Sequence, residues 1–333
     1  MTRRLPLDVP LIIGHRGAPG YRPEHTASSY RLAFAMGADA VEPDVVATSD
    51  GVLVIRHENE ISGTTDVADR PEFADRRTTK RLDGAEITGW FTEDFTWAEL
   101  ATLRCRERLP ALRPGSAGFD DTEPILRLPD LLALVAEASA EHGREFGVVL
   151  EIKHATFFAG AGHDLAALVD RDLRAAGWAS GEHPLWIESF EQTVLDELRS
   201  RGVQGAYISL LEPEGAPADL VARDGAAAAT YANALAVPGL DNLAGAVDGI
   251  SVDKRILLRS SGTRLVAEAH ARGLRVFTWT CRPENAFLAR RFRGAGGAAA
   301  FGDYRAEWAA IAGTGVDGVF VDHPDLGRTA FRG

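Results

Sequence analysis

The chain has 333 residues, of which 45% are hydrophobic and 25% charged, a globular composition that excludes a disordered or fibrous protein. Its net charge is −12, from 36 basic and 48 acidic residues, and it has no basic block, which argues against nucleic acid or an anionic membrane as partner. Its two cysteines, Cys105 and Cys281, are far apart and indicate free thiols in a reducing compartment. No segment is apolar enough to span a membrane, and none before Leu11 is typical of a signal peptide. We therefore expect no stable membrane insertion and a cytoplasmic location, or secretion if a leader has been removed.

Short apolar runs alternate with helical patterns along the chain. The predicted strands are 11–14, 40–47, 148–152, 185–187, 206–210, 246–252, 274–280 and 318–321. The predicted helices are 28–36, 131–142, 165–176, 193–201, 264–272 and 307–312, most of them ending at glycine. A further strand, 52–55, follows the turn 48–51 and predicts a hairpin. Strands that alternate with helices indicate a parallel sheet, and eight of them predict one (β/α)₈ TIM-barrel domain over residues 1–333. An open, doubly wound sheet is the competing interpretation.

Residues 58–127 interrupt this alternation. The segment is rich in Asp, Glu, Arg, Thr and Pro and contains no convincing apolar strand. The pattern Thr96-Trp97-Ala98-Glu99 is a capping box that predicts a short helix through Leu103. A segment of this length is normally functional or a small subdomain. We interpret it as a cap inserted after the second strand, which lies over the barrel mouth and selects the substrate without supplying the chemistry.

Acidic residues stand where the predicted strands end, which is where parallel barrels place their active sites. Glu42 and Asp44 are two residues apart, so in one strand their side chains would share a face. Glu151 ends the third strand and supplies a third carboxylate. Neighbouring carboxylates repel each other, and a hard divalent cation such as Mg²⁺ or Ca²⁺ would relieve that repulsion. The sequence therefore predicts a metal site at this end of the barrel.

Two histidines and two basic residues occupy equivalent positions. His15 and His57 each follow an apolar run into a predicted active-site turn, and an unperturbed histidine titrates near neutrality, as acid–base catalysis requires. Arg16 and Lys153 offer positive charge to an anion, and lysine is scarce in this chain. There is no P-loop, dinucleotide-binding fingerprint or nucleophile elbow. A cation, two basic side chains and a histidine pair together indicate attack on a phosphate ester.

On these residues the sequence resembles the glycerophosphodiester phosphodiesterases. The similarity extends in order from about residue 11 to 326. Its motifs are Gly14-His15-Arg16-Gly17, Pro23-Glu24-His25-Thr26, Gly37 to Asp44, Val52 to His57, Leu150-Glu151-Ile152-Lys153, Ile187-Glu188-Ser189-Phe190, Thr278-Trp279-Thr280 and Gly315 to Asp322. The family fold is the barrel that the strand count predicts.

The resemblance implies a role for each matched position. It implies metal ligands at Glu42, Asp44 and Glu151, an acid/base pair at His15 and His57, phosphate contacts at Arg16 and Lys153, and pocket aromatics at Phe190 and Trp279. The implied reaction is metal-dependent hydrolysis of a small glycerophosphodiester to sn-glycerol 3-phosphate and an alcohol, with Ca²⁺ or Mg²⁺ as cofactor.

The cap gives the chain the look of one subgroup. Residues 64–69 and the long insertion are similar to the bacterial periplasmic, calcium-using enzymes. The chain departs from the family pattern at Glu58, where Asp is usual, and at Ser62-Gly63, where an arginine is common; His25 is shared with this subgroup, while many relatives have Asn there. Two alternatives remain open, a sphingomyelinase D-like phosphodiester lyase and a catalytically inactive binding barrel. The sequence does not fix the alcohol, the metal, the role of each histidine or the oligomeric state.

Overall fold

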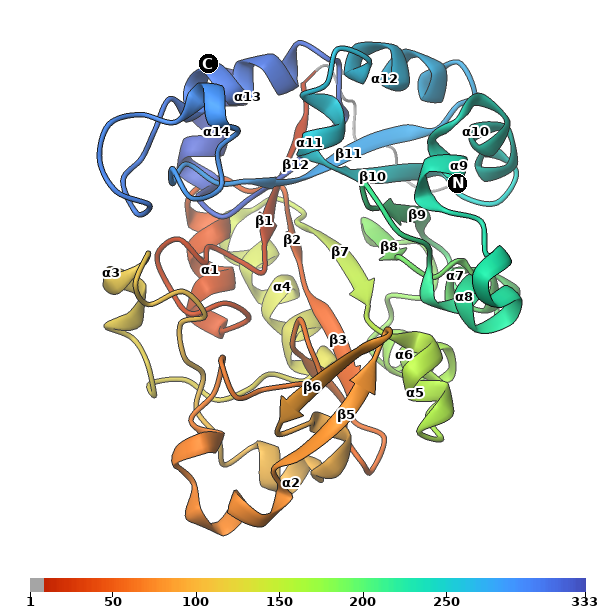
Figure 1. Ribbon diagram of the computed structural model, residues 1–333. Helices are drawn as coiled ribbons and strands as arrows, with labels where there is room; N and C mark the ends of the chain where they lie inside the picture. The colour runs from red at the N-terminus through yellow and green to blue at the C-terminus, as the bar shows by residue number, and fades with distance from the viewer. Residues whose placement is uncertain (1–8) are drawn as a thin grey trace.

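The computed structural model describes residues 9–333 and forms a closed barrel of eight parallel strands (Figure 1). The expectation about a leader concerns residues 1–8 and so lies outside the described chain. The strands are β1 (Leu11–His15), β2 (Ala40–Glu42) continued by β3 (Asp44–Ala47), β7 (Gly147–Ile152), β8 (Leu185–Ser189), β9 (Ala206–Leu211), β10 (Gly249–Asp253), β11 (Arg275–Cys281) and β12 (Gly318–Val321). Each is hydrogen-bonded to the next, β1 to β12 and β2 to β7, so the sheet closes. The predicted barrel is confirmed, and the open sheet is excluded.

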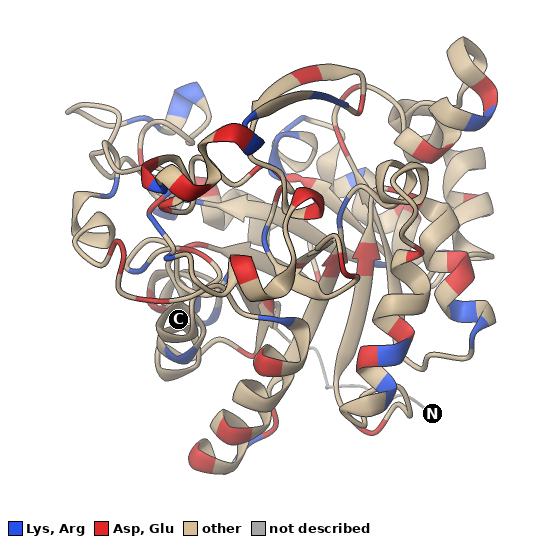
Figure 2. Cartoon of the chain, turned by 90° about the horizontal axis from the view of Figure 1, so that it is seen from below, with Lys and Arg blue, Asp and Glu red and all other residues tan. Residues whose placement is uncertain are grey.

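Helices connect these strands and surround the barrel (Figure 1). The longer ones are α1 (Ala27–Ala35), α4 (Leu128–His142), α6 (Leu165–Ala175), α7 (Gln192–Ser200), α10 (Val237–Ala244), α12 (Gly262–His270), α13 (Tyr304–Ala312) and α14 (Pro324–Arg332). Shorter ones lie in the βα loops: α5 (Ala155–Gly160), α8 (Ala218–Asp224), α9 (Tyr231–Leu235) and α11 (Lys254–Leu257). None of the helices within residues 9–333 has the length and apolar character needed to cross a bilayer. Acidic and basic residues are interspersed over the helices and loops, with acidic ones more frequent (Figure 2).

Side chains alternate along each strand between two cores. Leu11 and Ile13 belong to a small cluster inside the barrel, whereas Ile12 between them belongs to the larger cluster under the helices. Val149 and Phe277 continue the inner cluster on β7 and β11. This period of two fixes which strand residues face the barrel axis.

The second strand is interrupted, where a single strand 40–47 was predicted. Pro43 separates β2 from β3, because proline has no N–H to give to the ladder. Beyond it, β3 pairs with β7 on one side and antiparallel with β4 (Leu53–Ile55) on the other, which confirms the predicted hairpin.

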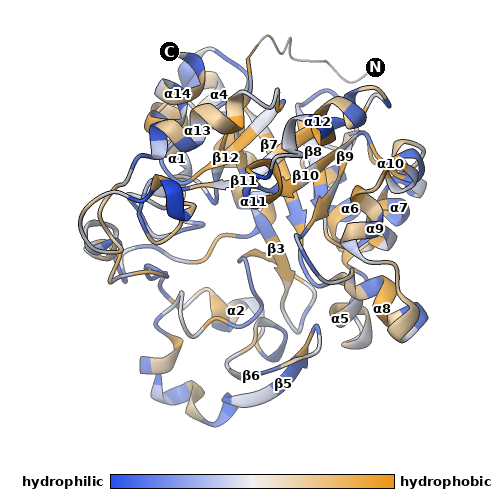
Figure 3. Cartoon of the chain, turned by 45° about the horizontal axis from the view of Figure 1, so that its top comes forward, coloured by the Kyte–Doolittle hydropathy of each residue, from blue (hydrophilic) through white to orange (hydrophobic). Residues whose placement is uncertain are grey.

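Residues 58–127 lie at the end of the molecule toward which β3 and β7 point (Figure 1). They contain the helices α2 (Trp97–Leu100) and α3 (Pro114–Ala117), and α2 begins with the predicted Thr96–Glu99 capping box. They also contain a hairpin that the sequence analysis did not predict, formed by β5 (Thr78–Leu82) and β6 (Ala85–Gly89). Its strands are mostly exposed and β5 is largely hydrophilic in Figure 3, unlike the barrel strands, so no apolar pattern marked it.

Candidate active site

The polar residues at the strand ends point to the same side of their strands as the apolar residues inside the barrel. His15 follows Leu11 and Ile13 on β1, Glu151 follows Val149 on β7, and so each side chain faces the barrel axis above the apolar cluster. Alternation thus directs these polar groups into one space at the carboxyl ends of the strands.

Strand register then brings three carboxylates together. His15 lies beside Glu42, and Glu151 lies between Asp44 on one side and Glu188 on the other. Oxygens of Glu42, Glu151 and Glu188 all lie within 4.8 Å of one another, and all three side chains are buried.

These three carboxylates, the acidic trio, have strongly perturbed pKa values. Burial, followed by repulsion from Asp44 and Glu151, raises the pKa of Glu42 well above its usual range. Burial and the same kind of repulsion raise the pKa of Glu188 strongly. Burial also raises the pKa of Glu151 to about 8, although Lys153 opposes the shift. Removed from water and close to each other, these groups require either protons or a cation.

Asp44 has different partners. One oxygen is 2.9 Å from Nε2 of His25 and 3.6 Å from Nε of Arg16. The other oxygen is buried without a hydrogen-bond partner, 3.9 Å from Nζ of Lys153. Burial opposes ionisation of Asp44, but His57, the bond from His25 and the charge of Lys153 outweigh it and hold the pKa well below its usual range. Asp44 is therefore an ionised carboxylate at the edge of the acidic trio.

The turn after β1 places Arg16. Its φ of 56° is in the left-handed region that few non-glycine residues adopt. This conformation lets the backbone N–H of Arg16 donate to Oε2 of Glu42 at 2.8 Å, while the guanidinium lies 3.1 Å from Glu24. Gly17 follows at φ 97°, where a Cβ would collide with Ser29. The Gly-His-Arg-Gly motif is thus a tight turn that fixes a carboxylate and a guanidinium together.

The two predicted acid/base histidines both reach this site. Nδ1 of His15 is 2.6 Å from Asp322, and Nδ1 of His57 is 2.5 Å from Glu58. Burial and the nearby Arg16 lower the pKa of His15 to about 4. Burial, Arg16 and Lys153 lower that of His57 to about 3. The sequence predicted titration near neutrality; the structure differs because His15 is buried beside Arg16, and the partly exposed His57 lies beside Arg16 and Lys153.

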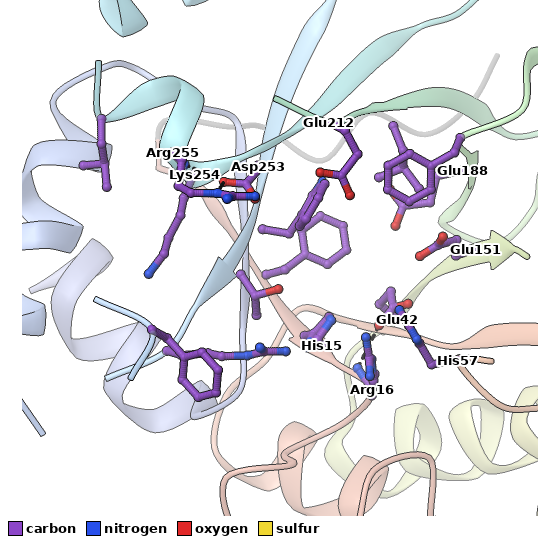
Figure 4. Close-up of a pocket in the computed structure, with 18 of the residues that line it drawn as sticks. His15, Arg16, Glu42, His57, Glu151, Glu188, Glu212, Asp253, Lys254 and Arg255 are labelled. Carbon is purple, nitrogen blue, oxygen red and sulfur yellow. Dashed lines mark hydrogen bonds and ion pairs between the residues drawn. The ribbon is translucent and has the colours of Figure 1, made fainter. Parts of the chain in front are cut away.

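A cavity of about 600 Å³ opens above the acidic trio. In Figure 4, His15, Arg16 and His57 lie around Glu42, while Lys254 and Arg255 lie on the far side. Eight of the nine predicted site residues line the cavity, namely His15, Arg16, Glu42, His57, Glu151, Lys153, Phe190 and Trp279; the ninth, Asp44, is completely buried behind them. A second cavity of about 580 Å³ adjoins the first and shares Glu151, Lys153, Phe190 and Glu212 with it.

The two predicted aromatics form part of the wall of the first cavity, and Phe190 also lines the second. Phe190 and Trp279 meet edge to face, with ring centroids 5.8 Å apart. The ammonium of Lys153 lies 5.5 Å from the centre of the Phe190 ring. Sequence reasoning left it open whether these rings pack in the core or face the pocket, and the structure places both in the cavity wall.

Sequence reasoning missed several residues of this site. Glu188 stood in a matched motif at the end of β8, and the strand-end criterion that selected Glu151 would have selected it as well. Asp322, at the end of β12, carried the same signal. Arg108 and Arg113, which contact the carboxylates beside the histidines, lie in the irregular cap, where no periodicity indicates their direction.

The residues present suit a divalent cation. Three buried carboxylates lie close together, and buried oxygens of Glu188 and Asp44 have no hydrogen-bond partner in the described chain. An oxygen-only donor set of this kind is what Mg²⁺, Ca²⁺ and Mn²⁺ bind.

Comparison with known proteins gives a consistent result. The family model described as "Glycerophosphoryl diester phosphodiesterase family" matches residues 15–326. A glycerophosphodiester phosphodiesterase of Arabidopsis thaliana is 31% identical over 314 residues, covering 85% of this chain and 77% of the relative. One of Haemophilus influenzae is 28% identical over 198 residues, covering 57% and 52%.

Solved structures share the fold. A Silicibacter pomeroyi protein superimposes with a TM-score of 0.67 at 24% identity, covering 97% of this chain and 93% of that one. An Oleispira antarctica phosphodiesterase in complex with the product sn-glycerol 3-phosphate gives a TM-score of 0.64 at 20% identity, covering 97% and 96%. Since the family model spans nearly all of the barrel and the plant relative is similar over most of its length, the chain belongs to the glycerophosphoryl diester phosphodiesterase family of enzymes.

Proposed function

We propose that this protein hydrolyses glycerophosphodiesters to sn-glycerol 3-phosphate and an alcohol, with the help of a divalent cation. The observation that carries the proposal is one cavity lined together by the acidic trio, two histidines and two basic side chains. Family membership and the named activity of the relatives support the same reaction. The product bound in the Oleispira structure supports the proposal that the phosphate stays on the glycerol and leaves as sn-glycerol 3-phosphate.

We assign the cation to Glu42, Glu151 and Glu188, with the unpartnered oxygen of Asp44 as a fourth candidate ligand. Mg²⁺, Ca²⁺ or Mn²⁺ bound there would neutralise the carboxylates and attract the phosphate oxygens. Arg16 lies beside the trio and is shaped for two contacts with a phosphate, and Lys153 provides a point charge on the other side.

The histidines move the protons. One takes a proton from the nucleophile, which is water or the neighbouring glycerol hydroxyl, as a bond to phosphorus forms. The other gives a proton to the alcohol oxygen as the P–O bond to that oxygen breaks. Attack by water gives sn-glycerol 3-phosphate directly, whereas attack by the hydroxyl gives a cyclic phosphate, which a water molecule then opens to the same product. Both rings are neutral at pH 7 in the free protein, since their pKa values are about 4 and 3. An anionic phosphodiester beside them raises both values, which favours protonation of the acid in the complex.

The second cavity would receive the alcohol. It begins at Phe190 and Lys153, beside the reacting phosphate, and its wall includes Phe157, Tyr231 and Val221. Its charged groups come from the hairpin tip, Asp83 among them, and from strand ends. A cavity of this size accommodates a bulky, partly apolar alcohol.

An activity screen tests the proposal. Glycerophosphocholine, glycerophosphoethanolamine, glycerophosphoglycerol and glycerophosphoinositol are each incubated with Ca²⁺, Mg²⁺ or Mn²⁺, and with EDTA as control. We expect sn-glycerol 3-phosphate to appear with at least one cation and to disappear with EDTA. Turnover of every diester unaffected by prolonged chelation would contradict the metal assignment, and turnover of none with any cation would contradict the function.

A further inference from the structure

Each histidine is held by a carboxylate at Nδ1. His15 contacts Asp322 and His57 contacts Glu58, at 2.6 and 2.5 Å. Nε2 of His57 lies 3.3 Å from the ammonium of Lys153, which can only donate, so Nε2 accepts and the ring proton is on Nδ1. A carboxylate on Nδ1–H fixes the tautomer and the ring plane, so that Nε2 is the nitrogen that can exchange a proton with the substrate.

Each of these carboxylates is in turn held by an arginine of the cap. A guanidinium nitrogen of Arg108 is 2.6 Å from Oε2 of Glu58, and one of Arg113 is 2.6 Å from Oδ2 of Asp322. In both cases the arginine takes one carboxylate oxygen and the histidine takes the other. Arg113 donates a hydrogen bond to Asp322, and Arg108 forms a close ion pair with Glu58. A guanidinium held this close to one oxygen constrains how each carboxylate faces its ring.

Both arginines are themselves fixed. Arg108 forms two bonds to Glu24, at 2.8 and 2.6 Å, and Arg113 bonds to Glu284 at 2.8 Å. They lie five positions apart on one turn of chain, where the backbone N–H of Arg113 donates to Leu109. A single turn thus reaches the carboxylate partners of both histidines.

We propose that the turn 108–113, the bracing turn, positions the acid/base pair, with Arg108 acting through Glu58 on His57 and Arg113 acting through Asp322 on His15. The inference rests on the proposed function and changes the expected role of the cap. The segment was expected to select the substrate only; the bracing turn makes it part of the apparatus that orients catalysis, although neither arginine lines the cavity.

The two carboxylates differ in how many arginines hold them. Asp322 is also held by Arg282, a barrel residue, at 2.7 Å. Among the described residues, Glu58 has only Arg108 besides the histidine that it orients. Loss of Arg108 should therefore be more damaging than loss of Arg113.

Methionine substitutions test the proposal, because methionine keeps the length of the side chain and removes the bonds. The variants are Arg108→Met and Arg113→Met, with Arg108→Lys and Arg113→Lys as charge-retaining partners. Arg106→Met is the matched control, since Arg106 lies in the same stretch and bonds to Asp69 and Asp121 without touching either carboxylate. Arg113 is buried, so if its variant fails to fold, Arg108→Met and Glu58→Gln carry the test.

kcat and KM are measured on glycerophosphocholine and on a nitrophenyl phosphodiester, after a folding check by circular dichroism. For Arg108→Met we expect kcat to fall about 10–100-fold, the usual effect of losing an orienting partner, with KM changed less than about threefold. The loss of kcat should be smaller for Arg113→Met. Arg108→Lys and Arg113→Lys should each keep part of the kcat that the methionine variant loses. The kcat of Arg106→Met should stay within about twofold of wild type.

The nitrophenyl substrate separates positioning from a general structural effect. Its leaving group needs little protonation, so the arginine that serves the acid histidine should matter much less there, while the other matters equally with both substrates. Equal losses for all three methionine variants, a loss confined to KM, or no difference between the substrates for either arginine would overturn the proposal. Inactivity of the wild-type protein on both substrates and on the other three glycerophosphodiesters would instead refute the proposed function.

Discussion

Replacing Glu188 by glutamine removes one ionisable group from the acidic trio and keeps the shape of the side chain. Its carboxylate lies within 4.8 Å of those of Glu42 and Glu151. At an effective dielectric of about 20, each fully ionised pair at that distance repels by about 3.5 kcal/mol. Protonation at neutral pH already relieves part of this, as the raised pKa values indicate. We therefore expect Glu188→Gln to raise the free energy of unfolding of the cation-free protein by about 1–2 kcal/mol.

The assay is thermal unfolding, measured in EDTA and in about 5–10 mM Ca²⁺, Mg²⁺ or Mn²⁺. A ligand that binds only the folded state raises Tm. In EDTA, Glu188→Gln should melt about 1.5–3 °C above wild type, from the unfolding entropy of a chain of this length. With the cation, wild type should gain stability and Glu188→Gln should gain much less. Asp44→Asn should instead lower Tm in both buffers, because Arg16 and Lys153 lose an ionised partner. Glu212→Gln, in the same cavity but outside the trio, is the control. If the cation raised the Tm of Glu188→Gln as much as that of wild type, Glu188 would not be a ligand and this assignment would be refuted.

Three further results are expected. His15→Ala and His57→Ala should each lower kcat on glycerophosphocholine at least about 10²-fold while the cation-induced rise in Tm persists; near-normal kcat in both would make the histidines structural. In EDTA, stability should fall as pH rises from 7 to 8, because Glu151, with a folded pKa of about 8, keeps a proton that the unfolded chain has lost, and the added cation should stabilise more at pH 8 than at pH 7; a cation effect independent of pH in a titration of Tm would argue against the trio. Replacing the hairpin 78–89 by a short Gly-Ser linker should change KM and the preferred alcohol, because its tip lines the second cavity, with kcat kept within about threefold; kinetics across the four diesters identical to wild type would exclude the hairpin from substrate selection.

Alternation of apolar strands and helices was sufficient to predict the barrel, because each element had its own period and stop signal. The strand-end rule likewise brought His15, Glu42 and Glu151 together before any coordinates. The rule was applied only as far as the third strand. Glu188, at the end of the fourth, was therefore missed, although it lies in register beside Glu151. The break at Pro43 could have been anticipated from the residue type alone.

The structure of the cap was harder to predict from the sequence than the barrel, for a physical reason. Its hairpin has exposed, polar strands, and the only local signal was the Asp83-Gly84 turn, where both residues have positive φ. The contacts of Arg108 and Arg113 join residues far apart in the chain, and no pattern of hydrophobicity encodes them. The histidine pKa values were also beyond sequence reasoning, since they depend on the burial of His15 and on how close Arg16 and Lys153 lie to the two rings.

The central claim is that a phosphodiester bond is cleaved on the alcohol side at the acidic trio. Phosphorus NMR of glycerophosphocholine turnover tests it most directly, with wild type, His57→Ala and an EDTA-treated sample in parallel. The account predicts that the substrate signal is replaced by that of sn-glycerol 3-phosphate in the cation-loaded wild type, and that it persists in the other two samples. Accumulation of phosphocholine would place the cleavage on the wrong bond, a cyclic phosphate as the lasting product would favour the lyase alternative, and an unchanged substrate signal in the wild type would contradict the account.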